Sequence, residues 1–392
     1  MNKTVKLYYS DSKIREFDAV VLSCAKVMRD GVDIYAVILD RTAFFPEEGG
    51  QYSDTGTLGN VHVTDAREND GVITHFTDAP VGIGETVHGV IDFDDRFEKM
   101  QCHSGEHIVS GLIHKHYGLN NVGFHLGHDD VTLDFDGVLS SKELENIELL
   151  ANKAVYDNIE ITAEFPKPEA LASMNYRSKL ELTENVRIVT VGDIDICACC
   201  APHVSRTGEI GIIKLLDVVN YKGGIRIHML CGARALRDYG ARYMRNREIS
   251  NLISVTQTSV SAGVTRLLDE NSRIKYEMSA LKKAMVNEKI GTLARTGGNI
   301  IIFEKILGAD LMRDYVNEAV NFTDGFCAVF CEKNEDEYNY IVGVRDGVSP
   351  TARDIAAKLK ERFGARGGGS GIMISGGISA AEAEIRAFLE KI

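Results

Sequence analysis

The chain has 392 residues, with 44 lysines and arginines against 57 aspartates and glutamates, so its formal net charge is −13. Hydrophobic residues make up 44% and charged residues 26%, and this composition excludes disordered, collagen-like and disulfide-scaffold proteins. The excess of acidic residues argues against purely electrostatic nucleic-acid binding. Because we find neither a run of about 18 apolar residues nor an apolar segment at the N-terminus, we expect a cytoplasmic protein without membrane contact.

The first 94 residues predict a compact β-barrel-like subdomain, with a sandwich as the other way to bury the same strands. Segments of β-branched and aromatic residues show partial period-two alternation, and Gly, Asp and Asn separate them. The strand segments are 18–27, 33–45, 61–68 and 71–77.

Residues 95–240 predict an α+β domain in which helices cover an antiparallel sheet. One helix is expected from Asp95, a suitable N-cap, to Tyr117, because Gly118 follows as a stop signal. A second helix is expected over 142–156, since Ser140 and Glu143 fit a capping box. Further strands are predicted at 187–191, 210–218 and 225–230.

Residues 241–295 predict a helical linker, either one long helix or two helices broken near Gly263. Apolar positions alternate four and three residues apart, as in a coiled coil with one polar position. A helix packed on its own domain is the simpler alternative. The seam comprises Val260, Val264, Leu267, Asn271, Ile274, Met278, Leu281 and Met285.

The last segment, 296–392, predicts a small α/β domain in which helices pack on a sheet. Strands are expected at 300–306, 325–333 and 340–346, and helices at 310–320, 352–363 and 380–391. A glycine-rich segment, RGGGSGIMISGG, occupies 366–377.

Histidines and cysteines form a candidate metal site. His103 and His107 are four residues apart on the first predicted helix, so both imidazoles lie on one face. Cys199 and His203 follow a short strand-like segment at a workable chelate spacing. Three imidazoles and one thiolate suit tetrahedral Zn²⁺ best.

Spacing alone leaves alternatives open. Cys197 and Cys200 compete with Cys199 for the thiolate position, whereas Cys102 points about 100° away from His103 around the helix and is expected to pack in the core. The segment HSGEH also fits the inverted zinc-peptidase pattern, in which Glu106 would be the general base and a distant glutamate the third ligand.

A glycine-rich turn follows a predicted strand in FFPEEGGQYSDTG, residues 44–56. Gly49 and Gly50 allow positive φ or close approach of a partner, and Gln51 and Asp54 add polar groups beside them. A solvated hairpin tip is the simpler interpretation. A P-loop is excluded because the segment lacks the G-x-x-x-x-G-K-[ST] pattern.

Four ordered motifs carry a resemblance to a known family. FFPEEGGQYSDTG, HSGEH, CCAPHVSRTGEIG and RGGGSGIMISGG occur in this order. They resemble motifs of the editing domain and the C-terminal DHHA1-type domain of alanyl-tRNA synthetase. Without room for the aminoacylation domain, the chain is similar to the free-standing alanyl-tRNA editing proteins of the AlaX family, long type.

The resemblance implies one Zn²⁺ per chain, held by His103, His107, Cys199 and His203. It also implies a substrate pocket formed by the glycine-rich turn and a neighbouring strand. Catalytic contacts would come from Gln51 and Thr132. Further substrate contacts would come from Gly49, Gly50, Asp54, His125 and Asp134.

The implied activity is hydrolysis of the ester in mischarged tRNA(Ala), chiefly seryl-tRNA(Ala) and also glycyl-tRNA(Ala). A synthetase pocket for alanine rejects serine and glycine only weakly, so a second, hydrolytic sieve is needed. The alternatives are the zinc peptidase and a non-catalytic tRNA-binding module, which would account for the heptads but not for the metal residues.

The charge is unevenly distributed, which sharpens the expectation for partners. Residues 241–295 contain 10 basic and 5 acidic side chains, whereas 1–240 are strongly acidic. We therefore expect local tRNA contacts, with a solvated helix face as the alternative, and a homodimer through the linker helix and the C-terminal domain. The candidate contacts are Arg245, Arg247, Lys282, Lys283 and Arg366.

Overall fold

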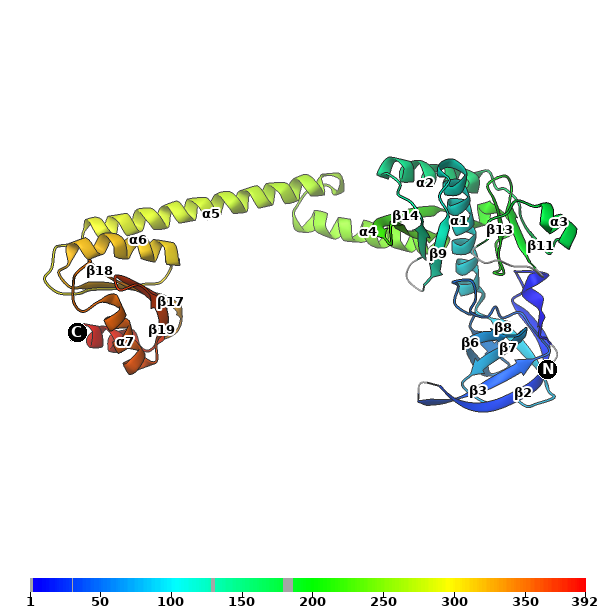
Figure 1. The fold of residues 1–392 in the computed structure, drawn as a ribbon, viewed down its shortest axis with the longest axis horizontal. Helices are drawn as coiled ribbons and strands as arrows, with labels where there is room; N and C mark the ends of the chain where they lie inside the picture. The colour runs from blue at the N-terminus through cyan, green and yellow to red at the C-terminus, as the bar shows by residue number, and fades with distance from the viewer. Residues whose placement is uncertain (1–2, 30, 128–130, 179–185) are drawn as a thin grey trace. The chain divides into compact units, whose positions relative to one another are not determined.

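The computed structural model is shown in Figure 1 and confirms the mixed α+β class. It describes residues 3–29, 31–127, 131–178 and 186–392. The chain divides into two compact units, Met1–Arg247 and Glu248–Ile392, and each is described by itself. The finer division into 1–94, 95–240, 241–295 and 296–392 stays a prediction.

A closed barrel forms the first part of unit 1 (Figure 1). Its buried positions alternate along the strands, as the period-two pattern of β7 and β8 requires. Asp70 and Gly71 both have positive φ, which gives the β6–β7 hairpin the backbone that a two-residue turn needs. In spatial order the strands are β2 (Glu16–Arg29), β3 (Val32–Leu39), β7 (Val72–Thr77), β6 (Val61–Asn69), β5 (Gly56–Leu58) and β8 (Thr86–Ile91).

Short elements accompany the barrel. Strand β1 (Val5–Lys6) pairs in parallel with β4 (Arg41–Thr42), and a 3-10 turn, η1, spans Leu7–Tyr9. The glycine-rich turn lies in the chain between β4 and β5. It pairs there with strand β9 (Asn121–Leu126) through a bridge between Gln51 and Leu126.

Helix α1 (Phe93–Tyr117) is the central element of unit 1 and begins two residues before the predicted start. Two aspartates in its first turn and a left-handed Gly118 at its end favour these boundaries. Most of the helix from Met100 to Ile113 is buried, so polar residues there must find partners inside the protein. Helix α2 (Ser141–Tyr156) begins with the predicted Ser140–Glu143 capping box, which is confirmed.

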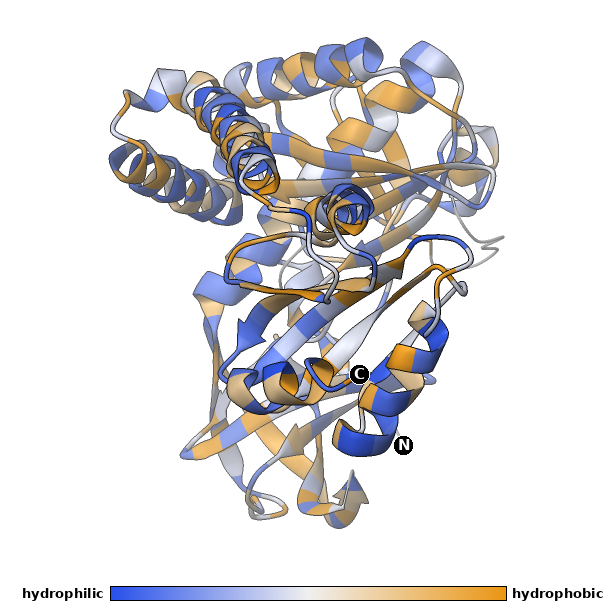
Figure 2. Cartoon of the chain, turned by 90° about the vertical axis from the view of Figure 1, so that its left-hand side faces the viewer, coloured by the Kyte–Doolittle hydropathy of each residue, from blue (hydrophilic) through white to orange (hydrophobic). Residues whose placement is uncertain are grey.

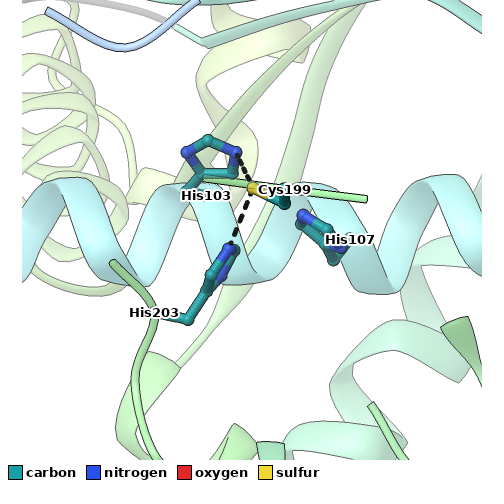
Figure 3. Close-up of side chains that lie close together, drawn as sticks. All are labelled: His103, His107, Cys199 and His203. Atoms are coloured by element: carbon teal, nitrogen blue, oxygen red, sulfur yellow. Dashed lines mark hydrogen bonds between the residues drawn. The ribbon is translucent and has the colours of Figure 1, made fainter. Parts of the chain in front are cut away.

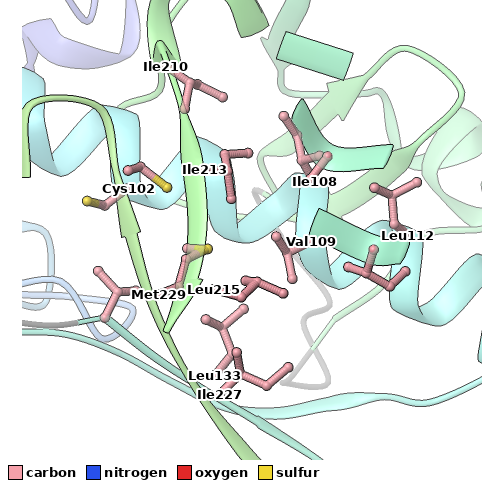
Figure 4. Packing of buried hydrophobic residues seen from close by; sticks show 14 of the residues in the cluster. Cys102, Ile108, Val109, Leu112, Leu133, Ile210, Ile213, Leu215, Ile227 and Met229 are labelled. Atoms are coloured by element: carbon pink, nitrogen blue, oxygen red, sulfur yellow. The ribbon is translucent and has the colours of Figure 1, made fainter. Parts of the chain in front are cut away.

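Two antiparallel sheets complete unit 1. Apolar side chains of α1 pack on the larger sheet: Ile108, Val109 and Leu112 meet Leu133 and Ile227 in the core (Figure 4). The larger sheet has the order β14 (Ile213–Tyr221), β15 (Gly224–Cys231), β10 (Val131–Phe135) and β9 (Asn121–Leu126). The smaller sheet comprises β11 (Ile161–Glu164), β12 (Ile188–Val191) and β13 (Asp195–Ala198), with α3 (Pro168–Ser173) and η2 (Thr207–Ile210) nearby in sequence.

The predicted linker consists of two helices. Helix α4 (Gly232–Leu252) begins before residue 241, and α5 (Val260–Gly291) follows the turn η3 (Gln257–Ser259). The break between the two helices therefore precedes Gly263, which lies within α5. Gly263 packs closely against the connection between the helices, because a Cβ there would lie 2.7 Å from Ile253 Cδ1. Figure 2 shows hydrophobic and hydrophilic residues mixed along the helices. The heptad residues Leu267, Ile274, Met278 and Leu281 are 44%, 52%, 47% and 71% exposed.

Unit 2 contains a five-stranded sheet between two helical layers. Alternating residues of β17 face opposite sides: Phe330 packs with α7 and α8, and Val329 packs with α6 and the end of α5. In spatial order the strands are β16 (Ile300–Glu304), β17 (Phe326–Asn334), β18 (Glu337–Val344), β20 (Met373–Ser379) and β19 (Arg366–Gly369). The other elements are α6 (Ala309–Ala319), η4 (Val320–Phe322), α7 (Ala352–Phe363) and α8 (Glu382–Leu389). No helix in the described part of the chain could span a membrane.

Candidate metal centre

Four side chains converge beside α1. His103 and His107 project from one face of α1, and Cys199 and His203 lie in the loop after β13 (Figure 3). One potential ligand atom from each lies within 4.8 Å of all the others. The structure thus brings together the four residues that the sequence selects as metal ligands.

The donor geometry fits one tetrahedral ion. Cys199 Sγ lies 3.5 Å from His103 Nε2 and 3.3 Å from His203 Nε2. Zinc bonded tetrahedrally to nitrogen at about 2.0 Å and to sulfur at about 2.3 Å places these atoms about 3.6 Å apart. The three imidazoles are almost fully buried, so the donor set is preformed in the protein interior.

Each histidine is oriented through its other ring nitrogen. His103 Nδ1 donates to Gln51 Oε1 at 2.9 Å, and His203 Nδ1 lies 3.1 Å from Ser104 Oγ. His107 Nδ1 lies 2.8 Å from Asp195 Oδ2. These contacts direct all three Nε2 atoms toward the thiol, which is the support that metal-binding histidines usually have.

Asp195 connects the cluster to a positive charge. Its carboxylate accepts from Arg177 Nε at 2.7 Å and from Arg177 Nη2 at 2.8 Å, in a bidentate pair. Asp195 was not selected from the sequence, because its contact with His107 spans 88 residues. A general rule could have indicated such a residue: a buried histidine that binds metal needs a carboxylate or carbonyl partner for its other ring nitrogen.

The protonation states favour metal binding. Burial raises the pKa of the Cys199 thiol, but His103 and His203 more than compensate and hold this pKa well below its usual value. Burial lowers the pKa of His203 to about 3, which keeps the ring neutral. Burial also lowers the pKa of His107, but Asp195 outweighs it and leaves this pKa well above the usual value. A metal ion would therefore displace a proton from His107.

The neighbouring thiols have other surroundings. Burial raises the pKa of Cys197 to about 11, and Cys197 groups with His107 and Asp195 rather than with all three histidines. Burial also raises the pKa of Cys200 strongly, and its thiol contacts Glu48. Cys102 is fully buried as a free thiol that forms a hydrogen bond with the thiol of Cys231, as expected for a packing residue.

The glycine-rich turn docks directly on the cluster. Gly49 and Gly50 have φ values of 61° and 83°, and a Cβ on Gly50 would lie 2.4 Å from Phe124 O. Glycine is required at this position because any side chain would collide with backbone. Leu126 N donates to Gly50 O at 2.7 Å, which fixes the turn on β9 and buries Gln51 completely beside His103.

Asp54 lies in a buried charge network rather than facing the cluster. Its Oδ2 accepts from Phe45 N at 2.6 Å and from Arg96 Nε at 2.8 Å. Lys99, fully buried, donates to Ser53 O at 2.7 Å. Both cations belong to α1, so this network fixes the end of the glycine-rich segment to the helix that carries His103.

The candidates on β9 and β10 lie on a different face. Leu133 packs in the core with α1, so alternation places Thr132 and Asp134 on the opposite side of the sheet. His125 pairs with Thr132 and shares that side. Asp134 forms a bidentate pair with Arg226 at 2.7 and 2.8 Å. The structure therefore does not bring these three residues to the four-residue cluster.

The candidate tRNA contacts are surface residues on three elements. Arg245 and Arg247 lie on α4, Lys282 and Lys283 on α5, and Arg366 on β19. All are exposed except Lys282, which is half-buried.

A polar cavity lies beside the cluster. It has a volume of about 610 Å³, and its lining includes Asn121, Arg177, Asp195 and Cys197. It therefore reaches the carboxylate that orients His107. The sequence did not indicate it, because its walls come from α1, the start of β9, the segment after α3 and the β12–β13 region.

Replacing Asp195 with asparagine should weaken Zn²⁺ binding by about 10- to 100-fold, because the neutral amide no longer supports the imidazole of His107 as the carboxylate does. Competition with a chromophoric chelator measures the affinity. Asp193→Asn is the matched control, since Asp193 is exposed and pairs with Lys115 instead. Equal affinities for both variants would contradict the supporting role of Asp195.

Comparison with known proteins gives two family matches. The model described as "Threonyl and Alanyl tRNA synthetase second additional domain" matches residues 186–267, which include Cys199 and His203. The model described as "tRNA synthetases class II (A)" matches residues 3–95, which include the glycine-rich turn.

Curated relatives match nearly the whole chain. The "Alanyl-tRNA editing protein AlaX-L" of Pyrococcus horikoshii is 29% identical over 97% of this chain and 96% of its own length. The "Alanine--tRNA ligase" of Natronomonas pharaonis is 31% identical over 99% of this chain, which spans only 44% of that ligase. Among solved structures, the C-Ala domain of Aquifex aeolicus alanyl-tRNA synthetase covers 24% of this chain at 17% identity, with a TM-score of 0.21.

Proposed function

Because the chain belongs to the family that joins the AlaX-L type of alanyl-tRNA editing proteins with the editing region of alanyl-tRNA synthetases, we propose that it is a trans-editing deacylase. Its substrates are mischarged tRNA(Ala), chiefly seryl-tRNA(Ala) and also glycyl-tRNA(Ala). The observation that carries this proposal is the contact between Gln51 of the glycine-rich turn and His103 of the metal cluster, which joins two motifs into one site.

Zn²⁺ is the proposed cofactor, one ion per chain, held by His103, His107, Cys199 and His203. When bound, it would polarise or position the aminoacyl ester. Four protein ligands leave no open position, which favours positioning. Water is then the nucleophile, and the ester needs no Ser–His–Asp triad because it is already activated.

Gln51 is the proposed specificity residue. Its Oε1 is used by His103, whereas its Nε2 is buried without a hydrogen-bond partner in the described residues. A buried donor without a partner is costly, so a substrate oxygen that accepts from it is favoured. The hydroxyl of a seryl group supplies such an oxygen and the methyl of an alanyl group does not, which gives discrimination against correctly charged tRNA.

The peptidase alternative has weaker support. The inverted zinc-peptidase pattern needs a distant glutamate as third ligand. Here Cys199 and His203 stand beside the two helix histidines, and Glu106 Oε1 accepts from Ser110 and Asn121. The chain also matches, over nearly its whole length, a relative whose name refers to alanyl-tRNA editing.

Phosphate contacts with tRNA are proposed on α4, α5 and β19, where the exposed basic residues lie. A homodimer is proposed through α5 and the C-terminal unit, because the heptad positions of α5 stay exposed in one copy. The non-catalytic tRNA-binding alternative accounts for these surfaces, but it leaves the buried metal cluster without a role.

A deacylation panel tests the proposal. Zinc-loaded protein should hydrolyse seryl-tRNA(Ala) much faster than alanyl-tRNA(Ala), and the rate with glycyl-tRNA(Ala) is measured beside them. Gln51→Ala should lower the seryl-to-alanyl rate ratio by about 10-fold or more, the expected effect of one hydrogen bond to a buried donor. Gln257→Ala, in unit 2, is the matched control. Hydrolysis of none of the three esters would contradict the proposed function, and an unchanged ratio would remove Gln51 from the pocket.

A further inference from the structure

Arg234 is a buried arginine in the first turn of α4, and its side chain reaches the glycine-rich turn. The residue is 6% exposed. Nη1 donates to Gly127 O at 2.7 Å, and Nη2 donates to the hydroxyl oxygen of Tyr52 at 2.8 Å. Nε lies 3.4 Å from Glu98 Oε2 on α1. One guanidinium thus contacts the glycine-rich turn, the residue after β9, and α1.

Two of these contacts lie beside the bridge that seats Gln51. Gln51 pairs with Leu126 in an isolated parallel bridge. Tyr52 directly follows Gln51, and Gly127 directly follows Leu126. Arg234 therefore holds both segments one residue beyond the point where they pair. This contact restricts how far the glycine-rich turn can move away from β9.

Tyr52 is held firmly enough to carry this constraint to Gln51. Its hydroxyl donates to Asp95 Oδ1 at 3.0 Å and accepts from Arg234, so the hydroxyl is used both as a donor and as an acceptor. Lys99 Nζ lies 4.0 Å from the centre of its ring. Since Asp95 and Lys99 belong to α1, the helix and the arginine together fix the residue next to Gln51.

The arrangement needs two donors in a fixed geometry. A guanidinium presents its two terminal nitrogens in one plane and bonds two acceptors at once, whereas the ammonium group of lysine is a point charge on a flexible stem. The acceptors here are a carbonyl and a hydroxyl, so both contacts depend on direction more than on charge. Glu98 lies near the charge, but Arg237 contacts this carboxylate more closely, at 2.6 and 2.7 Å. The specific contribution of Arg234 is therefore the spacing between the turn and β9.

We propose that Arg234 is a positioning residue for substrate specificity. By fixing the glycine-rich turn on β9, it holds the side-chain amide of Gln51 where this amide meets the hydroxyl of a seryl group. The inference rests on the proposed function and extends it to a residue that does not touch the substrate. A hydrogen bond weakens steeply when its distance and angle depart from the optimum, so a turn that shifts loses discrimination even though it keeps its own residues.

Arg234→Lys tests the proposal, because it keeps a positive charge but cannot bond both acceptors. In single-turnover deacylation with zinc-loaded protein, this variant should lower the seryl-to-alanyl rate ratio by about 3- to 10-fold, the range expected for one weakened hydrogen bond. Tyr52→Phe removes the hydroxyl and keeps the ring, and it should lower the ratio in the same direction. In a Gln51→Ala background, Arg234→Lys should change the ratio by less than about 2-fold, because the residue through which it acts is absent.

Hydrogen exchange gives a second readout that does not depend on activity. Peptides that cover residues 48–54 should exchange faster in Arg234→Lys than in the wild-type protein, because the bridge to β9 opens more often. Arg237→Lys is the matched control. Arg237 is exposed, lies three residues further along α4 and contacts the same Glu98, so this variant should change neither the exchange nor the ratio.

Zinc content is measured for every variant, and if Arg234→Lys does not fold, Tyr52→Phe carries the same test. An unchanged ratio in the folded variant overturns the proposal. A further fall of about 3-fold or more in the Gln51→Ala background also overturns it, because Arg234 would then not act through Gln51. Equal slowing of both esters would show a purely structural role. Failure of the proposed function is distinct: the wild-type protein would hydrolyse no seryl ester, and the inference would fall with it.

Discussion

Cys199→Ala is expected to lose Zn²⁺ and to reduce hydrolysis of seryl-tRNA(Ala) by at least about 100-fold, since even residues that only support a ligand cost 10- to 100-fold in affinity or activity. The physical reason is that Cys199 Sγ contacts both His103 and His203 and supplies the only thiolate of the four-residue set. Zinc content by atomic absorption and single-turnover deacylation measure the two effects. His103→Ala should behave in the same way.

The matched control is Cys24→Ala, because Cys24 is half-buried in the barrel and far from the ligand set in sequence. This variant should keep its zinc and its activity. A Cys199→Ala protein that lacks zinc but deacylates at the wild-type rate would contradict the metal's role. If Cys199→Ala retained zinc and Cys200→Ala lost it, the thiolate assignment would move to Cys200.

Asp54→Ala is expected to destabilise unit 1 by about 3–5 kcal/mol, the usual cost of removing one partner from a buried ion pair. Asp54 and Arg96 are each 1% exposed, and Arg96 would keep its charge without a carboxylate beside it. Urea unfolding followed by circular dichroism measures the change, because the chain has no tryptophan for fluorescence. Hydrogen exchange in barrel peptides locates the loss in unit 1.

Asp157→Ala is the control for this prediction. Asp157 forms an exposed pair with Lys153 four residues earlier on α2, and such pairs contribute about 0.5 kcal/mol or less. The double variant Asp54→Ala/Arg96→Met should recover part of the loss, because no unpaired guanidinium remains. A loss below about 1 kcal/mol in Asp54→Ala would show that the network is not structural.

The sequence predicted local features of the site well, because helix geometry fixes them. His103 and His107 share a face of α1 because residues four apart on a helix are neighbours on its surface. It could not choose among Cys197, Cys199 and Cys200, because the choice depends on how the chain leaves β13. The contact of Asp195 with His107 could not be predicted either, since it joins segments that lie 88 residues apart in the sequence.

Long-range pairing limited the fold prediction in the same way. Alternation identified strands and favoured a barrel but left a sandwich open as the alternative. The closed order is set by contacts between distant strands such as β2 and β8. The resemblance placed Thr132 with the substrate residues. The register of β10 instead puts it on the side of the sheet away from α1, which one strand's sequence does not reveal.

Helix α1 also sets a limit on how this protein can vary. Lys99 holds the glycine-rich segment, His103 and His107 hold the cluster, and Glu106 lies at its edge, all on one continuous helix. Each inserted residue would rotate everything after it by about 100° and advance it by about 1.5 Å. An insertion or deletion between Lys99 and His103 would therefore separate the loop anchor from the ligands. Length changes can accumulate in the surface hairpins of the barrel, but this stretch of helix must keep its residue count.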